Sequence, residues 1–306
     1  MDAVLFPGQG SQYVGMGSDF YKKFDLVKKI FKEVDETLGF SLSNIILNGP
    51  EEELKLTQNT QPAIMTVGVS IFQVLNQEYE LNLNKAKFFA GHSLGEYTAL
   101  VCAGSITIET ATHLLHERGK SMQEAVPSGE GAMLAILGMN IKDVEKEINL
   151  LPKNEICEIA NDNTDGQVVV SGKKLAINVL QKNLKEKRKK GILLPVSAPF
   201  HCSLMKNSAM HMKDKIENSN FSEPQPSIIS NVTAQAESDI NKIKPLLIDQ
   251  ITSRVRWKDS VNYMINNGAK KFLEIGPGKI LSGLVKKINK DVNISNISIM
   301  EDIKND

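Results

Sequence analysis

A serine near the end of the first third of the chain has the surroundings of a catalytic nucleophile. Gly91-His92-Ser93-Leu94-Gly95 fits the G-x-S-x-G pattern, in which the serine occupies a sharp turn between a strand and a helix. The glycines leave room for the neighbouring backbone, and the first amides of the helix point to where negative charge develops. We interpret Ser93 as a nucleophile. The alternative is an ordinary turn in which Ser93 caps the helix.

A serine hydroxyl needs a base to take its proton, and His201 is the histidine best placed for this role. It follows the apolar stretch ending at Phe200, where a predicted strand loops back, and catalytic residues gather at such strand ends. A purely structural histidine is the alternative. The other histidines are expected to point away from Ser93 or to lie on helix surfaces: His92, His113, His116 and His211.

Short apolar segments followed by tight turns predict the framework that carries these residues. The segments 3–6, 87–90 and 271–275 are expected as buried strands, and the last two run into helices at 96–103 and 279–288. Strand, turn and helix in this order build a parallel sheet covered by helices. Two more helices are predicted over 19–38 and 63–75, the second beginning just after Pro62.

The middle of the chain predicts a different unit. Strands are expected over 131–137, 155–160, 167–170 and 192–196, and helices over 141–150 and 175–189. This βαββαβ order is the plan of a ferredoxin-like domain. We therefore expect an α/β protein with a discontinuous large domain, 1–127 and 197–306, and a small domain, 128–196, inserted in it.

Composition argues against several classes of function. The 36 Lys and Arg residues balance the 36 Asp and Glu residues, which gives no support to nucleic-acid or membrane partners. Three cysteines without paired spacing argue against disulfides or a zinc site, and the N-terminus does not resemble a signal peptide. Gly8-Gln9-Gly10 lacks the third glycine of a dinucleotide loop. A cytoplasmic enzyme without a tightly bound cofactor or metal is the expectation.

Several segments, in this order and spacing, give the chain a resemblance to the malonyl-CoA:acyl carrier protein transacylases that runs nearly end to end. They are Phe6–Gln12, Thr60–Ala63, Gly91–Tyr97, Arg118–Gly119, Ala198–His201, Ser230–Val232 and Gly276–Lys279. The resemblance implies an α/β-hydrolase-like large domain with a ferredoxin-like insert. It also implies that malonyl-CoA acylates Ser93 and that the phosphopantetheine thiol of acyl carrier protein then takes the malonyl group.

The resemblance also assigns roles to residues. It implies that Ser93 and His201 form a dyad and that a main-chain carbonyl near Gln250 orients the histidine. The amides of Gln9 and Leu94 are implied to form the oxyanion hole, where each donor is worth a few kcal/mol.

Two residues are implied to select the acyl group. Arg118, one of four arginines in the chain, is implied to bind the malonyl carboxylate, since a guanidinium grips a carboxylate with two hydrogen bonds. Phe200 is implied to fill the space that the α-methyl of methylmalonyl needs. A surface arginine and a core phenylalanine are the alternatives.

Other functions remain open from the sequence. An esterase or thioesterase would share the nucleophile and the base, but needs no carboxylate-binding arginine. An idle carrier-binding module and a trans-acting acyltransferase of polyketide synthesis are further alternatives. Because carrier proteins are acidic, the basic run Lys182–Lys190 is a candidate docking face, with Lys286 and Lys287 as a smaller one. A solvated helix end is the other interpretation of that run.

Overall fold

The computed structural model describes residues 1–127, 129–152, 154–196 and 198–305, and it confirms the α/β class. Its larger sheet has the order β10-β9-β1-β2-β7-β8 and is parallel, except that β8 turns back on β7. The strands of this sheet are β1 (Ala3–Phe6), β2 (Phe88–Gly91), β7 (Ser227–Ile229), β8 (Ala236–Glu237), β9 (Lys271–Ile275) and β10 (Asn293–Ile297).

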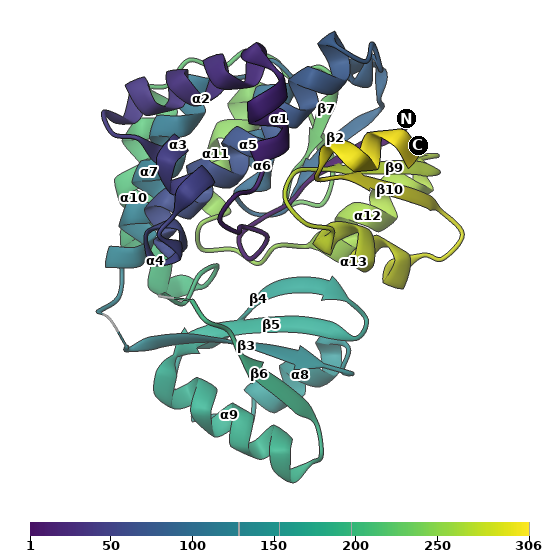
Figure 1. The fold of residues 1–306 in the computed structure, drawn as a ribbon. Helices are drawn as coiled ribbons and strands as arrows, with labels where there is room; N and C mark the ends of the chain where they lie inside the picture. Colours follow the sequence, from purple (N-terminus) through teal and green to yellow (C-terminus); the bar gives the residue numbers. More distant parts are fainter. Residues whose placement is uncertain (128, 153, 197, 306) are drawn as a thin grey trace.

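Helices cover both faces of this sheet, and together they form what we call the large lobe (Figure 1). The helices are α1 (Ser18–Lys23), α2 (Asp25–Leu38), α3 (Leu42–Asn48), α4 (Glu51–Lys55), α5 (Thr57–Gln77), α6 (Gly95–Cys102), α7 (Ile108–Glu124), α10 (Lys206–Glu217), α11 (Ile240–Asp249), α12 (Trp257–Asn266) and α13 (Ile280–Ile288). Side chains of β1 alternate between two cores: Phe6 packs with the core that includes α5, and Leu5 with the core that includes α12 and α13.

The small lobe is a four-stranded antiparallel sheet of order β4-β5-β3-β6, made of β3 (Gly131–Leu137), β4 (Cys157–Thr164), β5 (Gln167–Lys173) and β6 (Lys190–Leu193). The helices α8 (Ile141–Ile148) and α9 (Lys174–Glu186) lie on the face turned away from the large lobe (Figure 1). The predicted βαββαβ order is therefore present, with strand ends shifted by a few residues. Residues 128 and 197, where the expected domain boundaries fall, lie outside the described residues.

One loop of the large lobe joins the small sheet directly. The amide of Val255 donates to the carbonyl of Ala160 in β4 at 2.8 Å, and the amide of Asp162 donates to the carbonyl of Val255 at 2.9 Å. The strand predicted to end at Ala160 continues to Thr164. This longer strand carries Asn161 and Asn163 to the junction between the lobes.

Two of the helix predictions were wrong in detail. The helix predicted over 19–38 is broken at Phe24, whose backbone is extended (φ −115°, ψ 122°). The apolar stripe continues in phase across the break, so its period cannot reveal it. The helix expected to begin after Pro62 begins at Thr57, with Pro62 inside it.

A histidine makes Pro62 tolerable inside α5. A proline cannot donate to the carbonyl four residues earlier, which here belongs to Gln58. Instead His116 Nδ1, on α7, lies 3.1 Å from that carbonyl. His116 is therefore half-buried and bonded, whereas His113, on the same helix, is exposed as expected.

No helix in the described part of the chain is long and apolar enough to cross a membrane.

Candidate active site

The turn at Ser93 depends on its two glycines. A Cβ on Gly91 would lie 1.9 Å from the carbonyl carbon of Gly95, and one on Gly95 would lie 2.3 Å from the carbonyl oxygen of Phe6. Ser93 itself has a φ of 54°, a left-handed conformation that costs a non-glycine residue about 1 kcal/mol. The sequence therefore builds a crowded, strained elbow between β2 and α6, as the G-x-S-x-G pattern predicts.

Asn231 braces this strained turn. Its side chain accepts a hydrogen bond from the Ser93 amide at 2.7 Å and donates one to the Gly91 carbonyl at 2.7 Å. Asn231 follows β7, the neighbour of β2 in the sheet. The brace therefore comes from the next strand end along the same edge.

His201 lies within hydrogen-bonding distance of the Ser93 hydroxyl. Its Nε2 is 2.8 Å from Ser93 Oγ, and its Nδ1 is 2.9 Å from the main-chain carbonyl of Gln250. A carbonyl can only accept, so Nδ1 carries the proton and Nε2 is free to accept from the serine. Burial, and then the charge of Arg118, lower the pKa of His201 to about 3. The histidine is thus a neutral base with its lone pair directed at Ser93.

Arg118 is fully buried beside the same hydroxyl, which contradicts the surface alternative. Its Nη2 donates to Ser93 Oγ at 3.2 Å and to Gln250 Oε1 at 2.7 Å, and its Nη1 donates to Gln61 Oε1 at 2.7 Å. Both strong partners are neutral amides. Among the described residues no carboxylate hydrogen-bonds to the guanidinium, so its charge is available to a bound anion.

These groups meet at a cavity of about 420 Å³ between the lobes, within the range of small-molecule sites. Gln9 and Leu94 line it, and within the described residues neither main-chain amide donates a hydrogen bond to the protein. Phe200 lines the cavity beside His201, and Met133, Leu194 and Val196 supply apolar wall from the small lobe and its connection. The site residues named from the sequence lie around this cavity, except that Gln250 stands behind it.

Among the described residues none of the remaining histidines hydrogen-bonds to Ser93, although His92 also lines this cavity. His92 Nε2 is 3.0 Å from Asn163 Oδ1 on β4, and its ring lies beside that of Trp257, tilted by 54° with the ring centroids 5.6 Å apart. His211 is exposed on α10 next to Glu117. Among the described residues no group of three or more His, Cys, Asp or Glu side chains is arranged to hold a metal ion.

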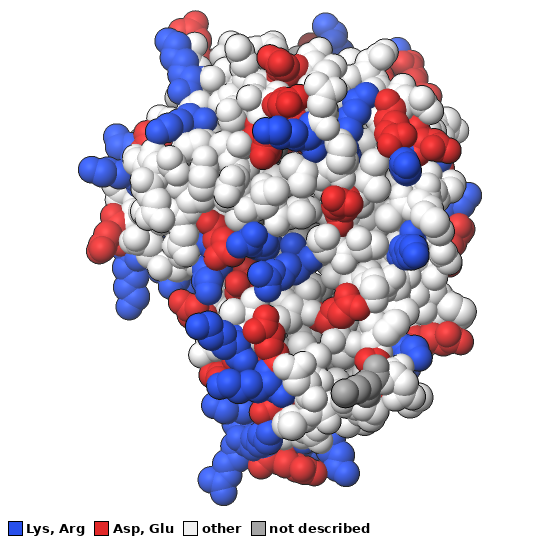
Figure 2. All heavy atoms as spheres, turned by 180° about the vertical axis from the view of Figure 1, so that it is seen from behind, with Lys and Arg blue, Asp and Glu red and all other residues white. Residues whose placement is uncertain are grey.

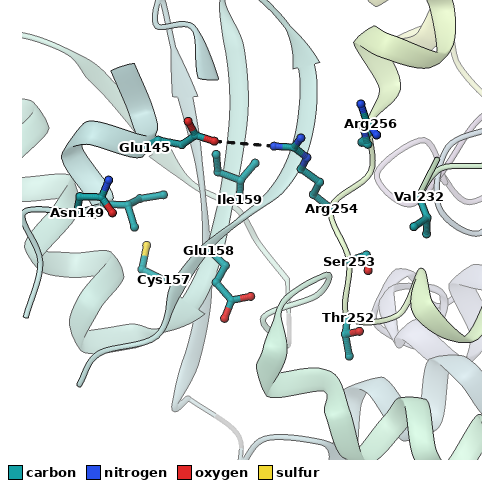
Figure 3. A pocket seen from close by; sticks show the side chains of 11 residues that line it. Glu145, Asn149, Cys157, Glu158, Ile159, Val232, Thr252, Ser253, Arg254 and Arg256 are labelled. Carbon is teal, nitrogen blue, oxygen red and sulfur yellow. Dashed lines mark ion pairs between the residues drawn. The ribbon is translucent and has the colours of Figure 1, made fainter. Parts of the chain in front are cut away.

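A second hollow of about 690 Å³ lies behind the loop that follows Gln250. In Figure 3 the side chain of Arg254 reaches from this loop towards Glu145 on α8, with 3.9 Å between Nη1 and Oε1. Arg256 is bound to Asp259, and Glu158 accepts from the Ser203 amide at 3.0 Å. The acidic and basic side chains named here thus each have a hydrogen-bond or ion-pair partner, and neither Ser93 nor His201 lines this hollow. The reactive groups therefore lie in the first cavity.

Three residues of the site had no role assigned from the sequence: Gln61, Glu96 and Asn231. Each lies within a segment that carried the family resemblance. Polar residues at the start of a helix or after a strand usually cap or turn the chain. Only the three-dimensional arrangement shows that these three reach the nucleophile or its neighbours.

Known proteins resemble this chain over nearly its whole length. Residues 4–299 match the model of the acyl transferase domain family. The chain is 41% identical over 304 residues to a malonyl CoA-acyl carrier protein transacylase of Bacillus subtilis, covering 99% of this chain and 95% of that protein.

Solved structures of proteins with related names are similar to this chain over almost their whole length. An acyl-carrier-protein S-malonyltransferase of Bartonella henselae has a TM-score of 0.96 and 42% identity, covering 100% of this chain and 98% of that one. A malonyl-transacylase solved in complex with its type II polyketide acyl-carrier protein has a TM-score of 0.95 and 38% identity, covering 99% and 97%.

Proposed function

Because this chain belongs to the acyl transferase domain family, among the malonyl CoA-acyl carrier protein transacylases, we propose that it moves malonyl groups from malonyl-CoA to acyl carrier protein. The observation that carries the proposal is the meeting of Ser93, His201 and Arg118. Ser93 Oγ lies 2.8 Å from His201 Nε2 and 3.2 Å from Arg118 Nη2. A nucleophile, a base and a carboxylate-binding group thus meet at one point.

The first half-reaction follows from this geometry. His201 Nε2 takes the proton of Ser93 while Oγ attacks the thioester carbonyl, and the amides of Gln9 and Leu94 stabilise the oxyanion. When the C–S bond breaks, His201 returns the proton to the coenzyme A sulfur. Malonyl-Ser93 remains, with its free carboxylate held by the guanidinium of Arg118.

The second half-reaction uses the same groups in reverse. The phosphopantetheine thiol of the carrier protein gives its proton to His201 and attacks the acyl carbonyl, and Ser93 leaves with a proton from His201. The chemistry needs neither a metal nor a bound cofactor, because His201 carries every proton. We infer that the reaction supplies fatty acid synthesis. We also infer that it takes place in the cytoplasm, in keeping with three cysteines that are free and buried.

Phe200 supports malonyl as the acyl group. It is buried, lines the cavity and immediately precedes His201, so an α-methyl on the acyl chain would compete for its space. We expect a higher kcat/KM for malonyl-CoA than for methylmalonyl-CoA. Equal values for the two thioesters would contradict this steric role.

Intact-protein mass spectrometry after brief exposure to malonyl-CoA tests the function. The wild type should gain one malonyl group on Ser93, and Ser93→Ala should gain none while keeping its melting temperature. Adding carrier protein should remove the adduct faster than water does. Release by water alone would instead indicate the esterase or thioesterase alternative, and an adduct on Ser93→Ala would contradict the proposed nucleophile.

A further inference from the structure

Glu96 is a buried acid at the active site that takes no part in the chemistry above. It lies in the first turn of α6 and is 3% exposed. Burial raises its pKa to about 7, although hydrogen bonds from Gln250 and Asn231 and the charge of Arg118 oppose that rise. Burying a carboxyl group is costly unless hydrogen bonds or an opposite charge compensate it. Its contacts are therefore the place to look for its role.

One of those contacts leads to the nucleophile. The main-chain amide of Asn231 donates to Glu96 Oε2 at 3.1 Å. The side chain of Asn231 in turn accepts from the amide of Ser93 at 2.7 Å. Glu96 thus fixes the backbone of the residue that braces the strained elbow.

The other contact leads to the base and to the guanidinium. Gln250 Nε2 donates to the same oxygen, Glu96 Oε2, at 2.8 Å. A carboxylate oxygen accepts hydrogen bonds, so it selects the NH₂ end of the Gln250 amide and turns Oε1 towards Arg118, 2.7 Å away. The main-chain carbonyl of Gln250 holds His201 Nδ1.

We propose that Glu96 is a positioning residue whose Oε2 is the shared acceptor that keeps Ser93, His201 and Arg118 in register. The inference rests on the proposed function, because it concerns the same site. Both neighbours of Oε2 are donors, so the geometry requires an acceptor at this place. It does not require the negative charge.

Two substitutions separate the acceptor from the charge and from packing. Glu96→Gln keeps the size and an acceptor oxygen but removes the charge, and Glu96→Leu fills similar space with no acceptor. We expect kcat for malonyl transfer to stay within about threefold in Glu96→Gln and to fall about 100-fold in Glu96→Leu, as for a misplacement of about 1 Å. KM for malonyl-CoA should change little in Glu96→Gln and should rise in Glu96→Leu, because Gln250 Oε1 no longer holds Arg118 in place there.

Each other outcome overturns the proposal. Full activity in Glu96→Leu would mean that Glu96 only fills space. Equal losses in both variants would mean that the charge, and not the acceptor, matters. Glu274 provides the matched control, because it is a buried acid that accepts from the amides of Leu281 and Ser282, away from the cavity. Glu274→Leu should lower the melting temperature without changing kcat per folded molecule, and a similar 100-fold loss there would also overturn the proposal.

A double-mutant comparison covers the case in which Glu96→Leu fails to fold. Gln250→Ala removes the amide that Glu96 holds but keeps the main-chain carbonyl that orients His201. Glu96→Ala should therefore cost at least about fivefold less in kcat in the Gln250→Ala background than in the wild type. Equal costs in the two backgrounds would overturn the proposal. Failure of the proposed function itself would appear separately, as a wild type that forms no malonyl-Ser93.

Discussion

At the scale of single residues, the low pKa of His201 has a measurable consequence. Its pKa is lowered to about 3 by burial and then by Arg118, so the neutral form persists at all pH values above that. We predict that acylation of Ser93, measured by rapid quench, loses no activity through protonation of this base between pH 8 and pH 5. In Arg118→Ala the acidic inflection should move upwards. A wild-type inflection near 6.5 would contradict this prediction.

The same pKa affects stability with a definite sign. The unfolded chain binds a proton at His201 below its ordinary value of 6.5, but the folded chain does not until about pH 3. This histidine therefore makes the fold less stable as the pH falls through that window. Thermal melts of His201→Ala and the wild type should show a smaller acid-induced loss in the variant.

The third prediction at the residue scale concerns Arg118. Arg118→Ala should lower kcat/KM for malonyl-CoA by about 10²-fold or more, because a buried charge-assisted pair with the carboxylate is lost. Acetyl-CoA has no such carboxylate, and the variant should use it no worse than the wild type does. If transfer of both acyl groups falls equally, Arg118 holds the shape of the site and does not select the substrate.

How far the sequence predicts these residues depends on the kind of signal each one gives. Ser93 lies in a local pattern whose glycines are required sterically, so a single segment indicates it. His201 and Arg118 are more than 100 and about 25 residues removed along the chain, and only the fold brings them to Ser93. Glu96 is adjacent to the motif, yet its role depends on Gln250 and Asn231, which no local pattern connects to it.

At the scale of elements, α5 accommodates a proline because another helix supplies the missing donor. His116→Ala should lower the free energy of unfolding by about 1 kcal/mol, because the carbonyl of Gln58 loses its partner. His113→Ala, on the exposed side of the same helix, is the matched control and should change it by less than about 0.5 kcal/mol. Equal effects in urea titrations would show that the hydrogen bond to Gln58 contributes nothing.

Helices and strands were predictable where apolar residues recur at a regular spacing or where Gly or Pro ends the segment. The strands 3–6, 131–137 and 271–275 were predicted with the ends that the structure shows, since each is a short apolar run closed by a proline or a glycine. The break at Phe24 leaves the apolar stripe in phase, so the spacing of apolar residues does not mark it. The early start of α5 goes with a contact from another helix, that of His116 with the carbonyl of Gln58, which no local pattern predicts.

At the scale of the whole molecule, positive charge is unevenly spread although the net charge is zero. Figure 2 shows Lys and Arg side chains gathered along one side of the small lobe, at the bottom of that view. Within the basic run, Lys187 pairs with Glu147 at 2.7 Å, while Lys182 and Lys185 are exposed on α9. Docking of an acidic carrier protein is better tested at Lys182 and Lys185. Replacing Lys187 by Glu would also place a second carboxylate next to that of Glu147.

We predict that Lys182→Glu combined with Lys185→Glu raises KM for the carrier protein several-fold at low salt. Acylation by malonyl-CoA should not change. The effect should shrink with added salt, because exposed charges are screened beyond about 10 Å at 0.1 M. Lys22→Glu with Lys29→Glu, on exposed positions of α1 and α2, is the control. An unchanged KM at low salt would leave α9 as a solvated helix and shift attention to Lys286 and Lys287.

The pairing of Val255 with β4 connects the small lobe to the loop that orients His201. Val255 forms backbone hydrogen bonds with Ala160 and Asp162 of the small sheet. Five residues earlier, the carbonyl of Gln250 orients the imidazole of His201. A rotation of the small lobe would therefore either break these two backbone hydrogen bonds or displace the carbonyl of Gln250. A rotation of the small lobe that kept both hydrogen bonds would therefore change the shape of the cavity between the lobes and the orientation of His201 together.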